Sequence, residues 1–184
     1  MPLPGRFLSG AMRGAFSKKD GQLYVAGTRG WVSNAVRDGS FQRVRYTGKT
    51  VYLPLACNTY ANGMRLTFSQ PLDRSAAEDT GSYGIERWNY RYSKEYGSKE
   101  YSVVSADVVG HDPVEIRSAK LSPDGRSIFL GIPDLRPCMQ MMIKYNLKFE
   151  DGKSLRSDIY STIHKVGPPF AGIASNSAVV RQHQ

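Results

Sequence analysis

The feature that most constrains this sequence is a strand-length alternation of apolar and polar residues, interrupted at short intervals by turn signals. Asn62-Gly63 is followed by a run in which Met64, Leu66 and Phe68 fall on alternate positions. A longer run places five apolar residues on one face: Met139, Met141, Ile143, Tyr145 and Leu147. Because side chains alternate across a strand, this period of two predicts half-buried strands.

These runs predict about seven short strands between residues 50 and 166, and therefore an all-β fold of the antiparallel sandwich type. Pro54 lies within the apolar run Val51–Ala56 and has no N–H for a sheet ladder, so this run is expected at a sheet edge. The alternating faces Met64–Phe68 and Met141–Tyr145 are expected to meet in one core. The short acidic stretch after Asp73 is expected to form one helical turn.

The segment before residue 50 contains two further strand signals. Gln22–Val25 follows the Asp20-Gly21 turn signal, and Phe41–Tyr46 alternates apolar with basic residues. This segment also carries most of the net charge of +9, because residues 1–49 hold nine Lys and Arg against two Asp and Glu. Residues 50–165 are nearly neutral, with fifteen basic against fourteen acidic residues, and therefore do not favour nucleic-acid binding.

Several function classes lack their sequence signatures. No apolar run is long enough to span a bilayer, and the first residues do not resemble a signal peptide. Cys57 and Cys138 lie in no C-x-x-C pattern, and the sequence is compatible both with a disulfide between them and with two free thiols. His111, His164 and His183 are not spaced as metal ligands, and His111 is expected in a turn. No nucleophile elbow or phosphate-binding glycine loop is present, so we expect no catalysis by this chain.

Two longer stretches carry a family resemblance: NGMRLTFSQPLDRSAAEDTGSYGIERWNY and LSPDGRSIFLGIPDLRPCMQMMIKYNLKFEDGKSL. Together with SGAMRGAFSKKDGQLYVAGTRGW near the start, they resemble the C-terminal region of large secreted planctomycete and verrucomicrobial proteins. Those proteins join a glucose/sorbosone-dehydrogenase-like propeller to an Ig-like domain and often to a c-type haem domain.

The resemblance implies a partial β-propeller blade at residues 1–49 and an Ig-like β-sandwich at 50–166. Residues 167–184 are rich in Gly, Pro, Ser and Asn, and this composition predicts a disordered tail. The resemblance also implies that the chain is a fragment of an exported, periplasmic or extracellular protein whose other blades or domains are its partners. Pyrroloquinoline quinone or haem would belong only to that longer parent, because this chain lacks the CxxCH motif.

The resemblance suggests one cofactor-binding residue. In soluble quinoprotein glucose dehydrogenases, an Arg seven residues before an Asp-Gly turn contacts the quinone, and Arg13 has this spacing from Asp20. A guanidinium can hold a carboxylate of the quinone through two parallel hydrogen bonds. A second family Arg is replaced by Ala11, and the alternative is that Arg13 is a solvated loop residue.

Two groups of residues are candidate ligand contacts. Arg29, Trp31 and Arg37 lie in the loop after the strand at Gln22–Val25, where a Trp and two Arg could stack on a sugar or bind an anion. The alternative for Trp31 is packing between blades.

The second group is Trp88, Tyr90 and Tyr92, which would share one face of an extended chain and offer a platform for sugar rings. The alternative for this group is ordinary packing between neighbouring strands. The sequence thus predicts a non-catalytic structural and interaction module, with carbohydrate binding by this aromatic face as the second hypothesis.

Overall fold

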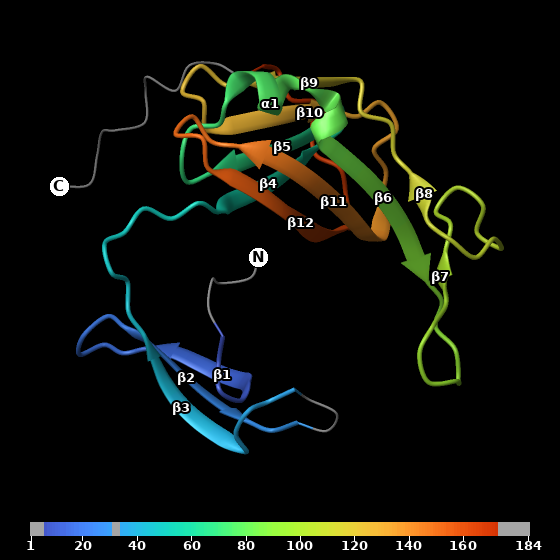
Figure 1. Ribbon diagram of the computed structural model, residues 1–184. Coiled ribbons are helices and arrows are strands. Elements are labelled where there is room, and N and C mark those ends of the chain that lie inside the picture. The colour runs from blue at the N-terminus through green and yellow to red at the C-terminus, as the bar shows by residue number, and fades with distance from the viewer. Residues whose placement is uncertain (1–5, 31–33, 173–184) are drawn as a thin grey trace. The chain divides into compact units, whose positions relative to one another are not determined.

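The computed structural model describes residues 6–30 and 34–172, and it divides the chain into two compact units, Met1–Thr50 and Val51–Gln184. Both units are built from antiparallel strands, so the prediction of an all-β protein is confirmed (Figure 1). Among the described residues, no helix is both long and apolar enough to cross a bilayer.

The first unit is a three-stranded sheet in the order β1-β2-β3. Its strands are β1 (Gly10–Phe16), β2 (Leu23–Thr28) and β3 (Gly39–Val44). The Asp20-Gly21 turn joins β1 to β2, with Gly21 at a φ of 67° that favours glycine. The sequence did not predict β1, whose Gly and Ala residues have low strand propensity. Cross-strand pairing with β2 forms this strand nonetheless.

The second unit has two antiparallel sheets. The four-stranded sheet runs in the order β4-β5-β10-β9, and the five-stranded sheet in the order β12-β11-β6-β7, with β8 paired to β6. The first consists of β4 (Pro54–Tyr60), β5 (Gly63–Phe68), β10 (Ser127–Gly131) and β9 (Ser118–Leu121). The second consists of β12 (Ser154–Ile163), β11 (Cys138–Lys148), β6 (Tyr83–Tyr90), β7 (Glu100–Tyr101) and β8 (Asp112–Pro113). The edge position expected for the Pro54 strand is confirmed.

One hydrophobic core lies between these two sheets. Met64, Leu66 and Phe68 of β5 belong to the same buried cluster as Met141 and Ile143 of β11, as their alternation predicted. The ring of Phe68 meets the ring of Tyr145 edge-on, with centroids 5.8 Å apart. Burial of side chains from both sheets supplies the main free energy of folding for this unit.

The helical turn expected after Asp73 is present as α1 (Arg74–Glu78), followed by the short 3₁₀ helix η1 (Thr80–Ser82). The Asp73 carboxylate caps α1 by accepting a hydrogen bond from the Ala76 amide at 2.9 Å. The Tyr83 hydroxyl donates to the Ala77 carbonyl, which fixes this end of β6 beneath the helix.

The prediction that Met139 faces the core is wrong. The register between β11 and β12 shifts by one residue between Cys138 and Met141, as in a β-bulge. Cys138 is therefore buried, whereas the side chain of Met139 is 49% exposed. Cys57 and Cys138 are both free thiols, and burial raises the pKa of Cys57 to about 11.

The chain continues along the second unit beyond Val166, where the sequence placed the domain boundary. Phe170 stacks on Phe129 with ring centroids 4.7 Å apart, and the Asn62 side chain exchanges two hydrogen bonds with the Phe170 backbone. The remainder of the predicted tail, residues 173–184, lies outside the described residues.

Candidate interaction site

The aromatic row expected at Trp88, Tyr90 and Tyr92 does not form one open platform. Trp88 is only 4% exposed, because the imidazole of His111 lies parallel to its ring at a centroid distance of 3.9 Å. The Trp88 indole N–H donates to the Tyr90 hydroxyl at 2.9 Å, so these two side chains do lie side by side. Tyr92 lies beyond the end of β6 and is fully exposed in a loop.

The other candidate residues belong to the first unit and lie apart from these aromatic residues in the sequence. Arg13 is an exposed residue of β1, and its guanidinium donates to the neighbouring Met12 carbonyl. Arg29 forms an exposed ion pair with Asp38 at 3.4 Å, and the backbone N–H of Arg37 donates to the Leu8 carbonyl. Trp31 lies outside the described residues.

The most distinctive surface of the second unit is formed by two loops at the end of β6. We name them the paired loops: residues 91–99, between β6 and β7, and residues 102–110, between β7 and β8. Both project away from the two sheets of this unit (Figure 1). Five large apolar or aromatic side chains on them are exposed to solvent: Tyr92, Tyr96, Val104, Val108 and Val109.

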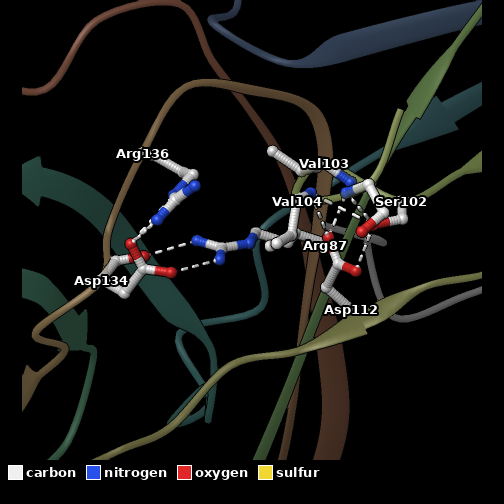
Figure 2. A network of polar contacts seen from close by, with 8 residues as sticks. Arg87, Ser102, Val103, Val104, Asp112, Asp134 and Arg136 are labelled. Carbon is white, nitrogen blue, oxygen red and sulfur yellow. Dashed lines mark hydrogen bonds and ion pairs between the residues drawn. The ribbon is translucent and has the colours of Figure 1, made fainter. Parts of the chain in front are cut away.

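The carboxylate of Asp112 holds the backbone of the second of the paired loops. Asp112 accepts hydrogen bonds from the Ser102 hydroxyl at 2.6 Å and from the amides of Val103 and Val104 at 2.6 and 3.0 Å (Figure 2). Burial disfavours the charged form of Asp112, but the bonds from Ser102 and the two amides outweigh it and lower the pKa of this carboxyl. The loop backbone is therefore fixed by a side chain of β8.

Arg91 joins the two loops to each other. Its guanidinium donates to the Asp107 carboxylate at 2.6 Å and to the Ala106 carbonyl, and it lies 4.3 Å from the centroid of the Tyr101 ring. The Arg91 amide also donates to the Ser98 hydroxyl at the far end of its own loop. One arginine of the first loop thus contacts both β7 and the second loop.

Arg87 supports the same region from the core side of β6. Its guanidinium is almost fully buried, and it donates to the Asp134 carboxylate at 2.6 Å and to the Asp134 carbonyl at 2.5 Å. Figure 2 shows this guanidinium pointing away from Asp112 toward Asp134, which also accepts from Arg136. The ion pair thus holds β6 at the position where Arg87 is the cross-strand partner of Asp112 on β8.

His111 links the loops to the outer face of β6. Its Nδ1 lies 3.0 Å from a carboxylate oxygen of Glu86 on β6, and its Nε2 lies 2.5 Å from one of Glu100 on β7. The hydrogen bond with Glu86 is the largest of the influences that raise the pKa of His111. The prediction that His111 lies in a turn is wrong, because Asp112–Pro113 pairs with β6 as strand β8 and places His111 directly before it. Nothing in the spacing of His111 indicates a partner distant in sequence.

The sequence did not single out the paired loops as a site. Of these residues only Tyr92 was a candidate, as part of an extended aromatic row with Trp88 and Tyr90. The Tyr-Gly-Ser sequence at residues 96–98 is a turn signal, and Gly97 has a φ of 85°. Within the described ranges, no group of three or more His, Cys, Asp or Glu residues is arranged to hold a metal ion. The paired loops therefore combine exposed aromatic and valine side chains with backbones that are held by hydrogen bonds with Asp112 and Arg91.

No family model matches the chain, and searches of the curated proteins and of the solved structures found no match.

Proposed function

We propose that this chain is a non-catalytic structural and interaction module of a larger exported protein, and that the paired loops bind another protein surface. The observation that carries this proposal is the exposure of Tyr92, Tyr96 and three valines on loops whose backbones are fixed by Asp112 and Arg91. A surface that is ordered before binding loses less conformational entropy when the partner docks.

The composition of the loops favours a protein partner. Residues 92–98 include two Tyr, two Ser and one Gly, and this combination is typical of recognition loops in which rigid aromatic rings supply contact area. The valines of the second loop add apolar area at the centre of an interface, where charge is usually depleted. Lys94, Glu95 and Lys99 are all exposed on the first loop, so the complementary surface is expected to carry charges of both signs.

The second unit suits the role of a rigid support, and we propose that it is an Ig-like sandwich. Two antiparallel sheets share one core in this unit, which is the arrangement that defines a sandwich. The loops of such folds lie at the ends of the strands and commonly carry recognition residues, as the paired loops do.

The first unit is proposed to be part of a β-propeller blade. Phe16, Leu23 and Val44 stand side by side across β1, β2 and β3, yet Phe16 is 73% exposed. Propeller blades usually have four strands and pack face to face with their neighbours. Further blades of the parent protein would cover this apolar row and are the proposed partners of the first unit.

The assignment to an exported, sorbosone-dehydrogenase-like parent rests on the sequence resemblance. In that setting the chain would act outside the cytoplasm, and any quinone or haem would be bound by other parts of the parent.

Site-specific photo-crosslinking tests the interaction surface. A photoreactive phenylalanine analogue is placed at Tyr96, at Tyr92 or, as the control, at Leu55, an exposed residue of β4. In cells that produce the full-length protein, we expect defined crosslinked products from the two loop positions and none from Leu55. Equal labelling from all three positions, or no product from the loop positions, would contradict the proposal.

A further inference from the structure

His111 occupies an unusual position between two acidic side chains from different strands. Glu86 belongs to β6 in the middle of the sheet, whereas Glu100 begins β7, the two-residue strand between the paired loops. Both ring nitrogens of His111 lie within hydrogen-bonding distance of a carboxylate oxygen, at 3.0 and 2.5 Å. The imidazole face rests on Trp88, which fixes the ring plane within 7° of the indole.

The protonation state of His111 decides how many of these contacts are favourable. A neutral imidazole carries one N–H and one lone pair, whereas an imidazolium carries two N–H donors. Ionised carboxylates only accept hydrogen bonds, so the neutral ring can bond to one glutamate while its lone pair faces the other. Only the protonated ring satisfies Glu86 and Glu100 together.

These contacts lie where the loops have little other attachment to the sheet. β7 pairs with β6 through only two residue pairs, Asn89 with Tyr101 and Tyr90 with Glu100. β8 adds two more pairs directly after His111. Loss of the Glu86 contact therefore removes a substantial part of what holds residues 99–111 against β6, and loss of the Glu100 contact separates His111 from β7.

We propose that His111 is a pH-dependent clamp that, when protonated, holds the paired loops in the conformation that binds the partner and, when neutral, releases them. The role in partner binding rests on the proposed function, whereas the clamp itself is a property of the free chain. All groups of the clamp belong to this chain: one imidazolium lies between two carboxylates.

The surrounding charges favour the protonated form. Glu86 faces the ring from β6 and Glu100 from β7, Tyr160 of β12 lies within electrostatic range of both glutamates, and the Asp112 carboxylate follows in the chain. Against these acidic groups, the nearest cation along β6 is Arg87, whose guanidinium is already paired with Asp134.

The direction of the pH dependence follows from linkage. The pKa of His111 is raised above its ordinary value of 6.5, chiefly by the Glu86 hydrogen bond and against partial desolvation. A raised pKa in the closed state means that protonation stabilises closure. The stabilisation is complete below the ordinary pKa and is lost as the pH rises through the raised one.

Amide hydrogen exchange of the full chain, followed by NMR between pH 5 and 9, tests the clamp. After division by the intrinsic pH dependence of exchange, protection of amides in residues 99–111 is expected to fall severalfold as the His111 ring titrates. In His111→Gln this step should disappear, and in Glu100→Gln, which keeps the ring, the titration and the step should move together to lower pH. His164→Gln serves as the matched control and should leave both unchanged.

Unchanged protection across the titration of His111, or a step that persists in His111→Gln, would overturn the clamp. Amides of β10 and β11 report in the same spectra whether each variant remains folded. Because these measurements use the free chain, a pH step without loop-specific crosslinking would retain the clamp and reject the proposed function. Loop-specific crosslinking without a pH step would retain the proposed function and reject the clamp.

Discussion

The imidazole of His111 lies parallel to the indole of Trp88, with ring centroids 3.9 Å apart and planes inclined by 7°. A residue of the chain thus occupies the ring face that an aromatic platform would offer to a sugar. The stack also brings a titratable group into contact with a fluorophore, so the protonation of His111 can be followed directly.

Tryptophan fluorescence should report this stack. A protonated imidazole quenches a stacked indole, so in a Trp31→Phe background the emission of Trp88 is expected to rise as the pH increases through the pKa of His111. His111→Gln should show a flat profile over the same range. Emission that does not depend on pH in the parent background would mean that the two rings do not stack in solution.

Because of the bulge in β11, Met141 is buried whereas Met139, two positions earlier, is exposed. Met141→Ala should lower the free energy of unfolding by about 2–5 kcal/mol, because it leaves a cavity between the two sheets. Met139→Ala should cost less than about 1 kcal/mol, because this side chain is largely in solvent. Urea denaturation measures both, and equal losses would contradict the register shift.

Asp112 should stabilise the second of the paired loops. Asp112→Ala removes the acceptor of two loop amides and is expected to cost about 1–3 kcal/mol, with Asp112→Asn costing less because one acceptor oxygen remains. Protection of the Val103 and Val104 amides should fall in the same order.

The pH dependence of this contribution differs from that of His111. The pKa of Asp112 is lowered in the fold, so its stabilisation is present above the ordinary value of 3.8 and is lost as the pH falls through the lowered value. Between pH 5 and 8 the effect of Asp112→Ala should therefore stay constant. A loss that varies in this range would assign the effect to another group.

Removal of the Asp134 carboxylate should destabilise the fold more than replacement of Arg87 by an uncharged side chain. Asp134→Ala leaves a buried guanidinium without its carboxylate and is expected to cost about 1–3 kcal/mol. Arg87→Met, which fills similar volume without charge, should cost at least about 1 kcal/mol less. Arg136→Ala is the control, with an effect within about 0.5 kcal/mol, because Arg136 is half-exposed.

If Arg87→Met is the most destabilising of the three substitutions, the prediction is contradicted. The contacts of the Arg87 guanidinium would then stabilise the fold by more than the free-energy cost of burying its charge. Thermal denaturation of all three variants at one pH provides the comparison.

The sequence predicted the parts of the fold that depend on local alternation. The buried faces of β5 and β11, the edge position of the Pro54 strand and the helical turn after Asp73 all follow from residue type and spacing. β1 was missed because its glycines and alanines have weak strand propensity, and only pairing with β2 makes it a strand. The bulge at Met139 could not be predicted, because Met139 is apolar although it is exposed, and the sequence therefore continues the apolar alternation through the position where the register shifts.

The candidate site was less predictable, because its contacts join residues distant in sequence. His111 reaches Glu86 and Trp88 only when β8 pairs with β6, and the alternation of Trp88, Tyr90 and Tyr92 gave no sign of that pairing. For Arg87, however, the sequence does carry a signal. Arg87 occupies a core-phase position of β6 together with Tyr83 and Ile85, and a charged residue in that phase indicates a buried partner.

The claim that this chain belongs to a larger exported protein is tested most directly by reading the coding DNA upstream of Met1. We predict an uninterrupted reading frame that encodes further β-propeller blades and, at its start, a signal peptide. A stop codon immediately upstream, with a ribosome-binding site before Met1, would contradict the claim and leave the paired loops as the surface of a free-standing protein.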